Sequence, residues 1–281
     1  MLGRLGMTMF LLACLPGAST AADQSKGAPI GQVTVQPADS SIHIEQIESR
    51  YLHERRSILV YVPSGVRHAP LPVIYVADGL APQVGAALHT LAAAGLAREV
   101  IVVGIAPGPA FDGMPTAETL RQNGERRTEE YLLAYPHGKA RFDAHEQFVL
   151  QEVLPLIEKK WGASADRRDR VVMGQSNGAA WALFMASRHP DQFSTAIALS
   201  FGWKPTLAQL RKGGAIERLY LSVGTREPPA FAVRSRQAAE ILAPHASWLR
   251  FDVTPDEHGQ TAWDQRYRDA LAWVFHATES K

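Results

Sequence analysis

Short runs of apolar residues alternate with longer amphipathic or alanine-rich segments through most of the chain. Apolar runs of about four to eight residues are typical of buried strands, and apolar residues repeated every three or four positions are typical of helices. The strands expected on this basis are 42–47, 57–63, 71–77, 99–106, 170–173, 195–200, 218–223 and 248–253. The expected helices are 81–97, 148–161, 179–188 and 263–275, and further helical segments are expected between the last three strands.

Strands that alternate with helices indicate an α/β fold, in which helices cover both faces of a mostly parallel central sheet. Segment 42–47 differs, because its apolar and polar residues alternate as they do in an antiparallel strand with one wet face. We therefore expect antiparallel pairing among the opening two or three strands. A chain of 281 residues is long enough for one sizeable domain of this class, which we place at 42–278.

The first 22 residues have the composition of a secretory signal peptide. Arg4 supplies the positive end, 7–15 is a short apolar core, and the small residues of 18–22 suit a cleavage site. Segment 23–41 is mostly small and polar, with scattered Pro and Gly, and is expected to be a flexible tether. These features predict a periplasmic or secreted protein.

Cys14 is the only cysteine, and it leaves an alternative open. The run Leu11-Leu12-Ala13-Cys14 resembles a bacterial lipoprotein cleavage box, so a lipid anchor at Cys14 would make this an outer-membrane lipoprotein. If Cys14 is instead removed with the signal, no thiol remains, which excludes disulfides, thiolate metal sites and a cysteine nucleophile. No later segment has the length and apolar character of a transmembrane helix.

Charge and motif content exclude further classes of function. The net charge of +1 gives no basic footprint for a nucleic-acid partner. The sequence has no HExxH motif, no clustered His and Asp at metal-ligand spacing, no GxGxxG motif and no P-loop. Metal catalysis therefore has no support in the sequence, and no dinucleotide- or phosphate-binding motif is present.

The most informative motif is Gly174-Gln175-Ser176-Asn177-Gly178, between an expected strand and an expected helix. In that context Gly-x-Ser-x-Gly is typical of a nucleophile elbow, a sharp turn that lifts the Ser hydroxyl clear of the sheet. Gly174 and Gly178 are expected where side chains would collide with the neighbouring backbone. The Asn177 N–H at the helix start is a candidate donor to an oxyanion.

A Ser nucleophile needs a base, and in this type of fold the order along the chain is Ser, acid, His. Four histidines follow Ser176, namely His189, His245, His258 and His276. Of these, His258 alone follows a strand, at the sheet edge where ligands bind. We therefore expect His258 to be the base.

The acid should follow the strand that precedes the His strand, and this position favours Glu227. Asp256 is the alternative, although a single residue separates it from His258. A Ser-His pair without a strong acid is the third possibility. The second oxyanion donor is expected from the turn 76–80, either from the N–H of Gly79 or from that of a neighbour.

Several motifs together resemble the esterase D and enterochelin esterase group of α/β-hydrolases. They are 59–63, 72–79, 102–105 followed by 127–131, 148–155, 174–178, 190–193 and 224–228. The resemblance implies an α/β-hydrolase fold and a serine ester hydrolase that needs no cofactor. It also implies Ser176 as the nucleophile and His258 as the base, and it supports Glu227 as the acid less strongly. Ala179 and the residues 259–263 after the His depart from the family pattern, which affects the expected substrate more than the chemistry.

The hypothesis with most support is a secreted serine carboxylic-ester hydrolase that forms an acyl-enzyme and acts on a siderophore-type or other small ester. The alternative is an acyltransferase that uses the same residues on a sugar or lipid acceptor, with the loop 107–124 as a lid that excludes water. A binding module without catalysis is the third hypothesis, and the intact Ser, His and turn glycines argue against it.

Overall fold

The computed structural model describes residues 41–64, 70–111 and 124–276. Within these residues, one eight-stranded sheet has the order β1-β2-β4-β3-β5-β6-β7-β8. The strands are β1 (Ser41–Ser49), β2 (Glu54–Val62), β3 (Val73–Ala77), β4 (Ile101–Ile105), β5 (Arg170–Gln175), β6 (Thr195–Leu199), β7 (Arg218–Gly224) and β8 (Trp248–Thr254). The α-helices are α1 (Ala81–Ala93), α3 (Gly124–Tyr131), α4 (Lys139–Phe148), α5 (Leu154–Trp161), α6 (Asn177–Arg188), α7 (Lys204–Leu210), α8 (Pro229–Leu242) and α9 (Gln260–Val274).

The sheet is mostly parallel, as the sequence predicts. β1 pairs antiparallel with β2, and β2 pairs antiparallel with β4. From β4 onward, through β3, β5, β6, β7 and β8, every neighbouring pair is parallel. The carboxyl ends of these parallel strands therefore lie along one edge of the sheet, where the loops that carry function are expected.

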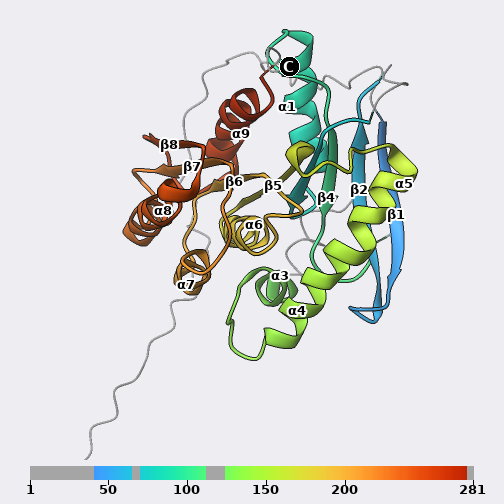
Figure 1. Ribbon diagram of the computed structural model, residues 1–281, viewed down its shortest axis with the longest axis horizontal. Coiled ribbons are helices and arrows are strands. Elements are labelled where there is room, and N and C mark those ends of the chain that lie inside the picture. The colour runs from blue at the N-terminus through green and yellow to red at the C-terminus, as the bar shows by residue number, and fades with distance from the viewer. Residues whose placement is uncertain (1–40, 65–69, 112–123, 277–281) are drawn as a thin grey trace, which may run out of the picture. The chain divides into compact units, whose positions relative to one another are not determined.

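Helices cover both faces of the sheet (Figure 1). One face packs against α1 and α9, and the other against α3 to α8. The structure explains why the sequence of strand β3 is apolar throughout. Its residues Val73, Tyr75 and Ala77 enter one core cluster, whereas Ile74 and Val76 enter the other, so both faces of the strand are buried.

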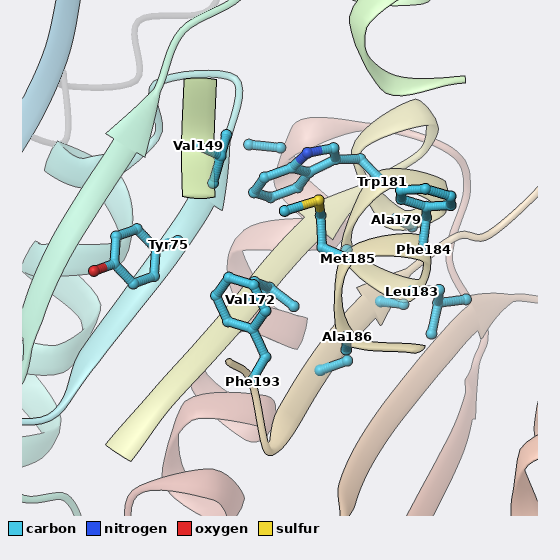
Figure 2. Close-up of a cluster of buried hydrophobic side chains, with 14 of the residues drawn as sticks. Tyr75, Val149, Val172, Ala179, Trp181, Leu183, Phe184, Met185, Ala186 and Phe193 are labelled. Atoms are coloured by element: carbon cyan, nitrogen blue, oxygen red, sulfur yellow. The ribbon is translucent and has the colours of Figure 1, made fainter. Parts of the chain in front are cut away.

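Helix α6 is anchored deeply in the larger core cluster (Figure 2). Trp181, Phe184 and Met185 from this helix are buried, as is Phe193 beyond it. The Phe193 ring meets Tyr75 of β3 edge to face, with 6.1 Å between ring centroids. Because residue 176 immediately precedes α6, this packing holds the turn between β5 and α6 in place.

Two helical regions differ from the sequence-based expectation. The segment expected at 148–161 is longer, since α4 begins at Lys139 and continues through a π-helical turn, Val149–Val153, into α5. The irregular turn ends two residues before Pro155, which has no N–H to donate to the helix ladder. Helix α3, with the sequence GERRTEEY, was not expected because it lacks an apolar stripe.

Helix α3 is held by buried charges. Glu130 of α3 accepts two hydrogen bonds from Arg56 of β2, both at 2.9 Å, and one from Arg141 of α4 at 3.1 Å. Burial alone would raise the pKa of Glu130. The neighbouring cations, among which Arg56 has the largest effect, more than offset burial, so the pKa lies below its ordinary value. His145 is buried in the same cluster, with its Nε2 3.9 Å from Glu130 Oε2. Neither ring nitrogen of His145 has a hydrogen-bond partner among the described residues.

We expect His145 to make folding sensitive to acid. Burial lowers its pKa from 6.5 to about 4, although Glu130 opposes that change. Between these pH values the unfolded chain binds a proton that the folded chain excludes, so stability falls as the pH falls, by up to about 3 kcal/mol. His145→Phe should remove this part of the pH dependence in urea unfolding between pH 7 and pH 4. His245→Gln, at an exposed position, is the control, and an unchanged pH slope in His145→Phe would refute the interpretation.

Several predictions lie outside the described residues. These are the signal peptide 1–22, Cys14 and its lipid anchor, the tether up to residue 40, and positions 112–123 of the proposed lid. The domain limits 42–278 therefore stay a prediction. Across the described part of the chain, no helix combines the length and apolarity needed to span a membrane.

Candidate active site

Ser176 occupies a sharp turn between β5 and α6. Its backbone has φ 55° and ψ −119°, a conformation that non-glycine residues rarely adopt. The Ser176 N–H donates to the carbonyl oxygen of Leu199 on the neighbouring strand, at 2.9 Å. The N–H of Asn177, at the start of α6, has no hydrogen-bond partner within the described ranges. The turn thus presents a hydroxyl together with a free N–H at a helix N-terminus.

The two glycines of the motif are required by close backbone contacts. A Cβ on Gly174 would lie 2.1 Å from the carbonyl oxygen of Gly178, a distance that no side chain tolerates. A Cβ on Gly178 would lie 2.8 Å from the Cβ of Ala77 on β3. The spacing seen in the sequence therefore corresponds to a turn that only glycine permits at both positions.

Ser176, His258 and Glu227 form a continuous hydrogen-bonded chain. His258 Nε2 lies 3.1 Å from Ser176 Oγ, and His258 Nδ1 lies 2.8 Å from Glu227 Oε2. Glu227 follows β7 and His258 follows β8, as expected from the order of the strands. The imidazole contacts two aromatic rings, with 4.4 Å between its centroid and that of Phe231 and 4.8 Å to that of Trp263.

Glu227 is buried and held as a carboxylate. Its Oε1 accepts hydrogen bonds from Ser200 Oγ at 2.8 Å, from the Gly224 N–H at 2.7 Å and from Arg266 Nη1 at 2.8 Å. Burial raises the pKa of Glu227, but the hydrogen bonds from His258, Arg266, Gly224 and Ser200 together lower it to about 2. The group that faces His258 is therefore ionised at neutral pH.

The other candidates for base and acid lie elsewhere. The alternative acid Asp256 has its Oδ2 3.6 Å from Arg266 Nε, and it makes no hydrogen bond to His258. His189 Nε2 lies 2.5 Å from Glu146, at the far end of α6, and His245 is exposed before β8. The structure thus brings together Glu227 and His258 and leaves the other candidates apart.

The turn after β3 requires a correction to the predicted oxyanion donor. The Gly79 N–H donates to the carbonyl oxygen of Ile105 at 3.1 Å, so it is not free. The Asp78 N–H is also engaged, by the hydroxyl of Tyr131 at 2.9 Å. The next N–H, that of Leu80, has no hydrogen-bond partner in the part of the chain that the structure describes. Leu80 therefore replaces Gly79 as the candidate from this turn.

A clamp from α3 holds this turn beside the nucleophile turn. Arg127 donates to both oxygens of Asp78, at 2.5 and 2.8 Å, and to the carbonyl oxygen of Gln175 at 3.2 Å. The Tyr131 hydroxyl adds a hydrogen bond to the carbonyl oxygen of Ile105 at 2.9 Å. In the sequence, 127–131 forms part of the family resemblance, and Arg127 is expected in a structural ion pair. Its partner Asp78 lies 49 positions away along the chain.

Arg127→Met is expected to lower kcat for a simple ester about 10- to 100-fold with little change in KM. The reason is that Asp78 loses its partner, so the turn that carries the Leu80 N–H is no longer fixed. The neighbouring variant Arg126→Met is the matched control, because Arg126 is exposed and, within the described ranges, its side chain approaches only Glu129, at 3.9 Å. Equal effects of the two variants on kcat, or an effect on KM alone, would contradict the clamp.

A cavity of about 310 Å³ opens beside the nucleophile. Its described walls are Thr128, Leu132, Tyr135, Ser176, Asn177, Gly202, Trp203 and Phe231. Trp203 Nε1 donates to the carbonyl oxygen of Leu133 at 2.7 Å, so this ring has no polar hydrogen left to offer a ligand. None of these walls carries a charged side chain, so the cavity suits an uncharged, apolar group.

A second cavity, of about 430 Å³, lies at the opposite edge of the sheet from Ser176. Its walls include residues such as Thr195 and Arg218, which begin strands. It is remote from Ser176, and its charged residues include mutually paired ones such as Arg168 and Asp166. Among the described residues, no group of three or more His, Cys, Asp or Glu side chains could hold a metal ion.

Known structures share this arrangement of sheet and helices. The enterochelin esterase of Shigella flexneri is 20% identical with a TM-score of 0.66, over 83% of this chain and 57% of its own. A ferulic acid esterase of Anaeromyces mucronatus is 15% identical with a TM-score of 0.66, over 88% of this chain and 94% of its own. At these identities the likeness establishes the fold, which is that of the α/β-hydrolases.

Sequence comparison gives the family. The profile of the Esterase family matches residues 49–274. The protein YjcH of Bacillus subtilis is 23% identical over an alignment of 254 residues, which covers 84% of this chain and 98% of YjcH. The chain therefore belongs to the Esterase family, and it is a carboxylic-ester hydrolase.

Proposed function

We propose that this protein hydrolyses small carboxylic esters through an acyl-enzyme on Ser176. The observation that carries the proposal is the hydrogen-bonded chain from Ser176 Oγ through His258 to Glu227, with distances of 3.1 and 2.8 Å. A Ser hydroxyl is a weak nucleophile unless a base accepts its proton and a third group orients that base. In the proposal, Ser176 is the nucleophile, His258 the base and Glu227 the group that orients it.

In the acylation step, Ser176 Oγ attacks the ester carbonyl carbon while His258 Nε2 accepts the hydroxyl proton. Glu227 fixes the tautomer in which Nδ1 carries hydrogen, and stabilises the imidazolium that forms. The negative charge that develops on the carbonyl oxygen is held by the N–H groups of Asn177 and Leu80. The tetrahedral intermediate then expels the alcohol, which takes the proton from His258 Nε2.

In the deacylation step, water takes the place of the alcohol. His258 accepts a proton from water as the water oxygen attacks the acyl carbon, and the same two N–H groups hold the second oxyanion. When this intermediate collapses, the carboxylic acid leaves and the proton returns from His258 to Ser176 Oγ. No cofactor is needed for either step.

For the substrate, we propose an uncharged ester with an aromatic or other compact apolar group. Support comes from the 310 Å³ cavity beside Ser176, which is lined in part by Tyr135, Trp203 and Phe231. Aromatic walls favour stacked or edge-on rings. A siderophore-type ester stays within this class, and the structural neighbours include an enterochelin esterase and a ferulic acid esterase.

A panel of p-nitrophenyl acetate, octanoate, benzoate and succinate tests this proposal. We expect kcat/KM for the benzoate to exceed that for the succinate by at least 10-fold, because the carboxylate of succinate would be desolvated without a partner. A preference for the succinate would refute the proposed substrate class. The acyltransferase alternative predicts that an added alcohol, rather than water, receives most of the acyl group. The lid proposed for that alternative, 107–124, lies largely outside the described residues.

We also propose that the protein is exported, on the basis of the signal-like composition of 1–22. N-terminal sequencing of the protein recovered from a periplasmic extract should begin near residue 22 or 23. A mature N-terminus at Cys14 that carries lipid would instead establish the lipoprotein alternative, and an uncleaved cytoplasmic protein would refute export.

A further inference from the structure

Among the described strands, β8 forms one edge of the sheet and pairs with β7 alone (Figure 1). Two of its apolar side chains are exposed, with 52% of Trp248 and 51% of Val253 accessible to solvent. No strand among the described residues covers its outer side. An exposed edge strand is a template for another strand, and proteins usually shield such edges.

We propose that a second copy of this chain pairs with this edge, so that two β8 strands lie antiparallel about a twofold axis at Phe251. Such an interface is isologous, because each copy uses the same seven-residue strand. It joins the two sheets into one continuous sheet.

The direction of the backbone groups supports this register. The Trp248 N–H donates to Glu217 at 3.0 Å, and the carbonyl oxygen of Thr254 accepts from Thr225 at 2.8 Å, so the even-numbered residues of β8 point toward β7. Since direction alternates along a strand, residues 249, 251 and 253 present their N–H and carbonyl groups outward. With a twofold axis at residue 251, residue 251 pairs with residue 251 of the second copy, and residue 249 pairs with residue 253. All of the hydrogen bonds between the two copies then join outward N–H and carbonyl groups.

The charges on β8 select the same register. With the axis at residue 251, Arg250 of each copy lies directly opposite Asp252 of the other, in the type of pair where side chains approach most closely. Within one chain these two residues already form an ion pair at 2.9 Å, so four alternating charges would meet at the axis. An axis at residue 250 or at residue 252 would also pair only outward groups. It would, however, place Arg250 opposite Arg250 or Asp252 opposite Asp252, and like charges directly opposite each other are unfavourable. The sequence of β8 is therefore complementary to itself in one register.

The proposal predicts a dimer that depends on concentration, since a single pair of strands buries a small interface. Sedimentation of the purified chain up to about 100 μM should show conversion from the monomer to a species of twice its mass. Val253→Pro removes one outward N–H and should abolish the dimer, because proline is tolerated on an edge strand where its nitrogen faces outward. Val253→Thr keeps the N–H and is the matched control. Ester hydrolysis at low protein concentration should be the same in both variants.

A charge exchange tests the register itself. Arg250→Asp should weaken the dimer at least 10-fold, since it places carboxylates opposite each other, and the double variant Arg250→Asp with Asp252→Arg should restore it. A chain that stays monomeric throughout the concentration range refutes the proposal. So does a dimer that survives both Val253→Pro and Arg250→Asp.

Discussion

Ser176→Ala is expected to lower kcat for p-nitrophenyl acetate by about 10⁵- to 10⁶-fold. The substitution removes the only oxygen within hydrogen-bonding distance of His258 Nε2 among the described residues. The residual rate would come from binding and from the Asn177 and Leu80 N–H groups, which the variant retains. Steady-state kinetics with intact-protein mass spectrometry would measure it and exclude contamination by wild-type enzyme.

Ser222→Ala is the matched control for this prediction. Ser222 is buried on β7 and its hydroxyl has no hydrogen-bond partner among the described residues, so its loss should leave kcat within about twofold. The melting temperature of Ser176→Ala should stay close to that of the wild type. If Ser176→Ala keeps more than about a hundredth of the wild-type rate, another group is the nucleophile.

Glu227→Gln is expected to lower kcat by about 10³- to 10⁴-fold. An amide facing Nδ1 can donate a hydrogen there, which favours the tautomer with hydrogen on Nε2, and that tautomer cannot accept the Ser176 proton. The substitution also removes the buried carboxylate 2.8 Å from Arg266 and leaves it only the partly exposed carboxylate of Asp256, at 3.6 Å, among the described residues, at a cost of about 3 kcal/mol in stability. Activity should therefore be measured well below the melting temperature of the variant.

Asp256→Asn separates the two candidate acids. Its carboxylate is partly exposed and lies near Arg266 rather than His258, so the variant should lose less than 10-fold in kcat. A larger loss in Asp256→Asn than in Glu227→Gln would make Asp256 the acid. Similar, small losses in both would indicate a Ser-His pair that works without an acid.

Much of the fold follows from local patterns in the sequence. Each buried strand is a short apolar run, because helices cover both faces, and Gly174 and Gly178 mark a turn that excludes side chains. His258 could be predicted from its position after the last strand. Glu227 follows the neighbouring strand, and the sheet order places the two loops side by side.

What the sequence does not reveal depends on contacts between distant residues. Helix α3 has no apolar stripe, and its place is set by the buried pair Glu130 and Arg56, 74 positions apart. The choice of Leu80 over Gly79 depends on which N–H is already bonded, here to the Ile105 carbonyl. Neither fact is visible in a local pattern, because each depends on the arrangement of whole elements.

The central claim is that Ser176 carries the acyl group, and a fluorophosphonate probe tests it most directly. The probe phosphonylates a serine that a neighbouring base activates, so the adduct identifies the nucleophile. The account predicts a single adduct, located by peptide mass spectrometry on Ser176, together with complete loss of ester hydrolysis. An adduct on another residue, or full ester hydrolysis by a protein that the probe does not label, would contradict it.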